Sequence, residues 1–167
     1  MKKLLIVGAG SFAPEVEEMA RLVGYDEIDF LDDNPRGSMC MPVIGVMADI
    51  EKWRGEYDEA IVALGNNDNR LKFTSELERC GYTIPSLVHP MAYVSPDAVL
   101  GAGCIVRAMC VVGRYVELGK ACILHMGAKV DHHCVIGEGS HLLVNSVVRG
   151  MKELPDRSRV ESGVVVQ

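Results

Sequence analysis

Apolar and polar positions along residues 1–86 follow two periods in turn. KLLIV is typical of a short buried strand, and the segment GAGSFAPEVEEMARLVGY after it places Val16, Met19 and Ala20 at helical spacing before a glycine. EIDFLDD and DEAIVALGNN indicate further strands, and NDNRLKFTSELERCGY indicates a second helix. Strands that alternate with helices predict a small Rossmann-like parallel α/β sheet, whose loops gather at the strand ends where such sheets bind ligands.

From Tyr93 onward the period of the apolar residues changes to six. Every sixth residue from Val94 to Val166 is aliphatic, and nearly every residue two positions earlier is small, Cys104, Cys110, Cys122 and Cys134 among them. One large and one small inward residue in every six is the pattern of hexapeptide β-helix repeats, in which three hexads form one triangular coil. The known hexapeptide solenoids wind left-handed. We therefore expect two domains, an α/β unit over residues 1–86 and a left-handed parallel β-helix over 87–167.

Composition and charge exclude several classes of protein. The net charge of −6 argues against a nucleic-acid partner, because the phosphate backbone attracts basic surfaces. The apolar run at the N-terminus stops after five residues, whereas a membrane span needs about 18–20. We expect a cytoplasmic protein without membrane insertion, whose cysteines are reduced thiols.

The densest group of reactive side chains is the stretch VDHHCVIGEGSH, residues 130–141. The hexad period places Cys134 inside the solenoid, which disfavours a zinc or redox site there. It places His132 two residues after inward Val130, at an exposed corner, where a histidine suits general-base catalysis. His141 precedes inward Leu142 and is predicted to face outward, and His125 is predicted to be a surface or interface residue. A zinc site built from these histidines is disfavoured, because the His-x4-His pair of solenoidal carbonic anhydrases is missing.

Five stretches in order resemble one known family. They are KKLLIVGAG, FLDDN, IVALGNNDNR, LVHPMAYVSPDAVLGAG and VDHHCVIGEGSH. Together they resemble the NeuD/PglD-type bacterial sugar O- and N-acetyltransferases. The resemblance implies acetyl transfer from acetyl-CoA, as co-substrate and without a metal, to an amine or hydroxyl of a nucleotide-sugar or sugar. It also implies a homotrimer with active sites between neighbouring solenoids.

The same resemblance assigns candidate residues. His132 matches the catalytic base, Asp131 and His133 occupy its flanking positions, and His141 is a plausible lining residue near the acetyl group of the cofactor. In the first domain, glycine turns at a helix start suit a phosphate, acids suit ribose or base donors, and an arginine suits phosphate. The residues matched to nucleotide-sugar binding are Gly8, Gly10, Ser11, Asp32, Asp33, Gly65, Asn66, Asn67 and Arg70.

Several departures from the family pattern leave a second interpretation open. His133 stands where the family keeps an acid, and Phe12 stands where its first loop has a histidine. About one coil, roughly 18 residues, is missing near the C-terminus with the hexad phase kept, together with the closing tail. The alternative is a non-catalytic nucleotide-sugar-binding or scaffolding relative that has lost coenzyme A binding. A NAD-dependent oxidoreductase is disfavoured, because residues 1–86 supply little more than half of a dinucleotide fold.

Overall fold

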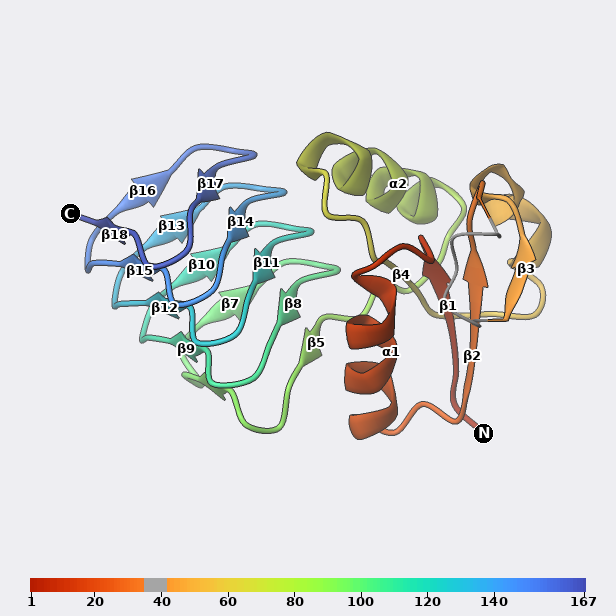
Figure 1. Ribbon diagram of the computed structural model, residues 1–167, viewed down its shortest axis with the longest axis horizontal. Helices are drawn as coiled ribbons and strands as arrows, with labels where there is room; N and C mark the ends of the chain where they lie inside the picture. The colour runs from red at the N-terminus through yellow and green to blue at the C-terminus, as the bar shows by residue number, and fades with distance from the viewer. Residues whose placement is uncertain (35–41) are drawn as a thin grey trace. The chain divides into compact units, whose positions relative to one another are not determined.

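The computed structural model describes residues 1–34 and 42–167, which form two compact units, Met1–Pro85 and Ser86–Gln167 (Figure 1). The first unit is a four-stranded parallel sheet in the order β3-β2-β1-β4, accompanied by helices. The three strands and two helices predicted before residue 85 are confirmed, and the structure adds a short strand and a 3-10 helix between residues 43 and 53. The strands are β1 (Lys3–Val7), β2 (Glu27–Leu31), β3 (Val43–Gly45) and β4 (Ala60–Val62), and the helices are α1 (Ala13–Leu22), the 3-10 helix η2 (Met47–Trp53) and α2 (Asn67–Arg79).

The central strand β1 forms the middle of the first core. Its residues 4–7 are completely buried, because parallel strands are covered on both faces. Gly8 follows β1 with φ +104°, and a side chain there would meet Leu64 and the carbonyl of Ala63. Only glycine fits this close approach of two loops at the strand ends.

None of the helices in the described residues is long and apolar enough to cross a membrane.

The second unit is a parallel β-helix of two-residue strands (Figure 1). Every third strand belongs to the same sheet, and paired residues are 18 apart, which is one coil. The three sheets have the orders β16-β13-β10-β7, β17-β14-β11-β8-β5 and β18-β15-β12-β9-β6. The strands are β5 (Leu87–Val88), β6 (Tyr93–Val94), β7 (Val99–Leu100), β8 (Ile105–Val106), β9 (Val111–Val112), β10 (Glu117–Leu118), β11 (Ile123–Leu124), β12 (Lys129–Val130), β13 (Val135–Ile136), β14 (His141–Leu142), β15 (Val147–Val148), β16 (Glu153–Leu154), β17 (Arg159–Val160) and β18 (Val165–Val166).

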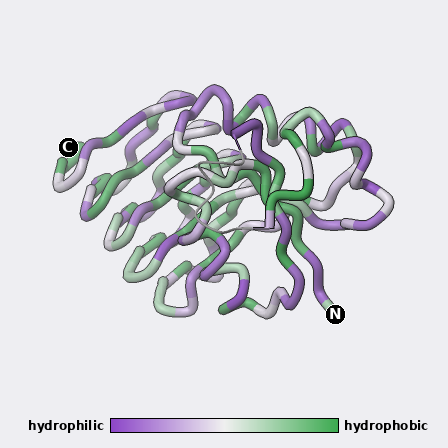
Figure 2. The backbone as a smooth tube through the Cα atoms, turned by 45° about the vertical axis from the view of Figure 1, so that its right-hand side comes forward, coloured by the Kyte–Doolittle hydropathy of each residue, from purple (hydrophilic) through white to green (hydrophobic). Residues whose placement is uncertain are grey.

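The hexad pattern accounts for the core of the β-helix. Its large inward residues form one buried cluster together with the four predicted cysteines, which are free thiols with at most 1% of their surface exposed. Hydrophobic and hydrophilic segments accordingly alternate along the coils (Figure 2). Corner glycines face the next coil, and a Cβ on Gly119 would lie 2.6 Å from the backbone nitrogen of Glu138. The small residues at the corners therefore permit tight stacking of successive coils.

Candidate active site

His132 lies in the turn between β12 and β13, and its backbone is held by both adjacent coils. The N–H of His133 donates to the carbonyl of Arg114 one coil earlier, and the carbonyl of His132 accepts from the N–H of Met151 one coil later, each at 2.9 Å. The N–H of His132 donates to Oδ1 of Asp131 at 2.8 Å. The corner thus presents the His132 side chain from a fixed backbone, and 48% of that side chain is exposed, as the period predicted.

The two nitrogens of the His132 ring have different surroundings. Nδ1 lies 3.1 Å from Nδ1 of His133, within hydrogen-bonding distance, and the two rings meet edge to face. Nε2 lies 4.0 Å from Oδ2 of Asp131, which is too far for a hydrogen bond. Asp131 therefore supports the backbone of the turn, whereas His133 is the side chain that contacts Nδ1.

A depression of about 340 Å³ opens beside the His132 ring. Its lining includes two cationic residues, Arg149 and Lys152, and one anionic residue, Asp131, so the balance of these charges favours an anionic ligand. Gly150 forms the wall next to the imidazole. The lining residues are Asp131, His132, Arg149, Gly150, Met151, Lys152 and Gln167.

The side chain of His141 points away from the inside of the coil, as the hexad period predicts, and only inward Leu142 joins the core cluster. The outward face is covered, however, because the His141 ring stacks on that of His125, with centroids 5.0 Å apart, and only 5% of the residue is exposed. His141 belongs to the sheet β17-β14-β11-β8-β5, whereas the His132 turn joins the other two sheets. Within one chain, the two histidines therefore lie on different sides of the triangular coil.

His125 has a partner that the sequence analysis did not identify. Nη1 of Arg107 lies 2.9 Å from Nδ1 of His125, which therefore acts as the acceptor. Burial, together with the charges of Arg107 and Arg159, lowers the pKa of His125 to about 4. The sequence spacing could have revealed this contact, because Arg107 and His125 are 18 residues apart and therefore lie at the same corner of two successive coils.

In the first unit, the loops that follow β1, β2 and β4 meet at one edge of the sheet. The N–H of Ala9 donates to Oδ2 of Asp32 at 2.7 Å, and the N–H of Met47 donates to Oδ1 of Asp33 at 2.9 Å. Gly10 and Ser11 are exposed beside them, and Asn66 caps α2 by accepting from the N–H of Asn69. The structure thus brings together Gly8, Gly10, Ser11, Asp32, Asp33, Gly65, Asn66 and Asn67.

The expectation that Arg70 pairs with a phosphate does not fit the structure. Arg70 is completely buried, and its guanidinium donates to the carbonyls of Leu64 and Gly65 and to Oδ1 of Asn67. These bonds bind the side chain to the loop between β4 and α2. Arg70 therefore stabilises this loop from the protein interior, and its guanidinium is not accessible to a ligand.

In the described part of the chain, no three His, Cys, Asp or Glu side chains are arranged to hold a metal ion.

Known proteins resemble this chain in both of its units. Residues 3–77 match the PglD N-terminal domain. The acetyltransferase domain of PglB from Neisseria gonorrhoeae, solved in complex with acetyl coenzyme A, is 31% identical with a TM-score of 0.88, over 99% of this chain and 91% of that one. The chain belongs to the NeuD/PglD-type family of sugar acetyltransferases.

A second member of the NeuD/PglD-type family extends the comparison. PerB from Caulobacter crescentus, solved in complex with CoA and GDP-perosamine, is 26% identical with a TM-score of 0.88, over 100% of this chain and 89% of that one. WeeI from Acinetobacter baumannii, at 17% identity and a TM-score of 0.63, shares the fold. The chain is thus homologous over its whole length to CoA-dependent nucleotide-sugar N-acetyltransferases.

Proposed function

We propose that this protein transfers an acetyl group from acetyl-CoA to an amino or hydroxyl group of a nucleotide-sugar, in bacterial glycan or surface-polysaccharide biosynthesis. The observation that carries the proposal is the exposed His132 ring, with Nδ1 paired to His133 and the rest of the ring beside a cationic depression. The relatives add support, since one was solved with acetyl coenzyme A and another with CoA and GDP-perosamine. Both substrates are cytoplasmic metabolites, so the proposal includes a cytoplasmic location.

The side chains at the His132 corner fit the parts of the reaction. Acetyl-CoA supplies an acetyl group that is activated as a thioester, and its phosphates match the charges of Arg149 and Lys152. Nε2 of His132 accepts a proton from the attacking amine or hydroxyl as the new C–N or C–O bond forms and the C–S bond breaks. The same proton then passes from His132 to the departing thiolate.

The loops at the edge of the first unit are the proposed site for the nucleotide-sugar. Gly10 and Ser11 lie just before α1 and are exposed, which suits a phosphate near the start of a helix. Asp32 and Asp33 are bonded to backbone N–H groups, and each carboxylate still has lone pairs for a ribose or base donor. Arg70 is left out of the ligand set because it is buried.

We also propose that the protein works as a homotrimer. His132 and His141 lie on different sides of a coil, so they can line one acetyl-CoA site only if they come from two chains. A site between neighbouring solenoids would satisfy this condition, and His141 would then face the acetyl group that the partner's corner uses. Sedimentation equilibrium tests the assembly, and three chains are expected.

Binding and turnover measurements separate this function from the non-catalytic alternative. Calorimetry with coenzyme A, and with a panel of UDP-, dTDP- and GDP-linked amino-sugars, reports on each ligand separately. Mass spectrometry of the same sugars after incubation with acetyl-CoA detects a gain of one acetyl group and its position. Binding of a nucleotide-sugar without coenzyme A binding, and without acetylation, would support the degenerate relative instead.

A further inference from the structure

The Nδ1 atoms of His132 and His133 lie 3.1 Å apart, and a hydrogen bond over this distance needs one ring to donate and the other to accept. A neutral imidazole carries its hydrogen on one nitrogen and accepts at the other. If His132 donates from Nδ1, its Nε2 is bare and can act as a base. If His133 donates instead, Nε2 of His132 carries the hydrogen and cannot accept a proton. The direction of this single hydrogen bond therefore decides whether His132 is a base.

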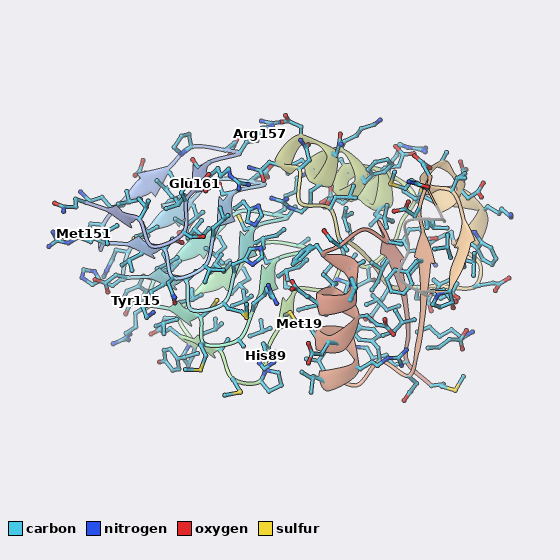
Figure 3. The ribbon with its side chains drawn as sticks, in the orientation of Figure 1. Met19, His89, Tyr115, Met151, Arg157 and Glu161 are labelled. Atoms are coloured by element: carbon cyan, nitrogen blue, oxygen red, sulfur yellow. The ribbon has the colours of Figure 1, made fainter. Side chains whose placement is uncertain are left out.

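The backbone and a neighbouring ring hold His133 beside Nδ1 of His132. His133 is in the left-handed region with φ +55°, and its N–H donates to the carbonyl of Arg114 in the preceding coil. Its ring rests against Tyr115, with centroids 4.8 Å apart. Tyr115 and Met151, labelled in Figure 3, occupy this corner one coil before and one coil after His133. The ring is thus positioned by a turn and by a neighbour that both belong to the rigid coil.

Asp131 cannot take the place of His133. Oδ1 of Asp131 accepts the N–H of His132, and Oδ2 lies near Nε2, on the other side of the ring from Nδ1. A carboxylate near Nε2 does not orient Nδ1. Of the charged groups around the pair, Arg114 in the preceding coil is bonded to Asp97, and Arg149 and Lys152 line the depression. His133 is therefore the side chain that contacts Nδ1 of His132.

We propose that His133 is the positioning residue of the acetyl-transfer site, a neutral imidazole that accepts the Nδ1–H of His132 and keeps Nε2 bare. The inference rests on the proposed function and identifies the residue that orients the His132 base. While Nε2 of His132 holds the proton taken from the amine or hydroxyl of the sugar, its Nδ1–H still donates to the uncharged ring of His133. A proton on Nδ1 of His133 would break this bond, because that nitrogen would then have no lone pair to accept Nδ1–H of His132.

Substitutions that fit the left-handed turn test the acceptor without straining the backbone. In His133→Asn, Oδ1 stands two bonds beyond Cβ, as Nδ1 does in histidine, and both asparagine and glycine tolerate this region. We expect kcat of His133→Asn to stay within about tenfold of wild type, and kcat of His133→Gly to fall by about 100-fold or more with little change in KM. Arg157→Gly, at another corner with φ +60°, is the matched control and should behave as wild type.

His133→Asp tests the charge of the acceptor. A carboxylate stabilises the imidazolium of His132, so the acidic limb of the pH dependence of kcat should move to higher pH than in the wild-type enzyme. His133→Asn, which has an uncharged acceptor, should leave this limb close to its wild-type position. An unchanged limb in His133→Asp would overturn the proposal, because the residue at 133 would then not be bonded to the catalytic ring.

Nitrogen-15 NMR of the full-length protein locates the proton without any substrate. In the wild type we expect the His132 spectrum of a ring protonated at Nδ1 and bare at Nε2, and in His133→Gly we expect this preference to be lost. A wild-type ring protonated at Nε2, or full activity of His133→Gly, would overturn the proposal. Absence of acetyl transfer by the wild type would refute the proposed function, and the spectra would still decide where the proton lies.

Discussion

Gly150 lies directly against the imidazole of His132, one coil further along the chain. A Cβ at Gly150 would stand 2.8 Å from both Cε1 and Nε2 of that ring. The absence of a side chain at Gly150 thus gives the ring its place and leaves its Nε2 edge open to the depression.

Gly150→Ala should therefore impair catalysis more than stability. The methyl group must push the ring aside, and a displacement of about 1 Å at a catalytic group can lower the rate about 100-fold. The exposed ring can swing into solvent, so we expect little change in the melting temperature. Steady-state kinetics and thermal unfolding measure the two effects. Gly55→Ala, where the new Cβ meets no atom within 4 Å, is the control, and equal kinetics of the two variants would contradict the prediction.

His125 should make the stability of the protein depend on pH. Its pKa is about 4 in the folded protein against an ordinary 6.5, so between these values the unfolded chain binds the extra proton. This contribution is complete above pH 6.5 and is lost as the pH falls toward 4. In His125→Asn, whose Oδ1 can still accept from Arg107, the loss of unfolding free energy between pH 7.5 and 5 should shrink by about 1–2 kcal/mol. Urea titrations at both pH values measure it, with His89→Asn as control, and identical losses in wild type and His125→Asn would refute the assignment.

The corner glycines should be sensitive to the smallest side chain. In Gly119→Ala the new Cβ would lie 2.6 Å from the nitrogen and 2.8 Å from the Cα of Glu138, both backbone atoms that cannot move aside without separating two coils. We expect a loss of about 1–3 kcal/mol in the free energy of unfolding. The expected order in denaturant unfolding is Gly119→Ala below Gly113→Ala, whose nearest contact is 3.0 Å, with Gly55→Ala close to wild type. A reversed order would show that the coils do not stack in this register.

Arg70 should act through the loop that it holds. In Arg70→Met the carbonyls of Leu64 and Gly65 and the amide oxygen of Asn67 lose their donor, at a cost of about 2–4 kcal/mol in the free energy of unfolding. Binding of a GDP- or UDP-linked amino-sugar should weaken with it, because the Gly65–Asn67 loop loses its support. Arg79→Met, an exposed arginine on the same helix, should leave both quantities unchanged. Weaker binding with unaltered stability would instead indicate direct contact between Arg70 and the ligand.

Periodicity alone predicted most of the fold. The hexads determined which residues face the core, because every coil repeats the same inward positions, and Cys134 lies inside and His132 outside accordingly. The three-residue strand β3 and the 3-10 helix η2 were not predicted, since Val43–Gly45 is only half buried and carries no clear period.

The candidate site was less predictable, because its features depend on contacts between coils. The 18-residue spacing could have paired Arg107 with His125, and Gly150 with His132, but no pattern in the sequence shows which nitrogen of a ring meets which neighbour. The burial of Arg70 and the stacking of His141 on His125 likewise depend on side-chain directions that residue type does not determine.

Acetyl transfer by the His132→Ala variant tests whether His132 is the catalytic base. Wild type and variant are mixed with acetyl-CoA and an amino-sugar nucleotide, coenzyme A release is followed, and assembly and melting temperature are measured on the same samples. Because the His132 side chain is half exposed at a corner held by backbone bonds, we expect both proteins to fold and assemble alike. We expect the variant to lose at least about 100-fold in kcat. Turnover of His132→Ala at the wild-type rate would contradict this role.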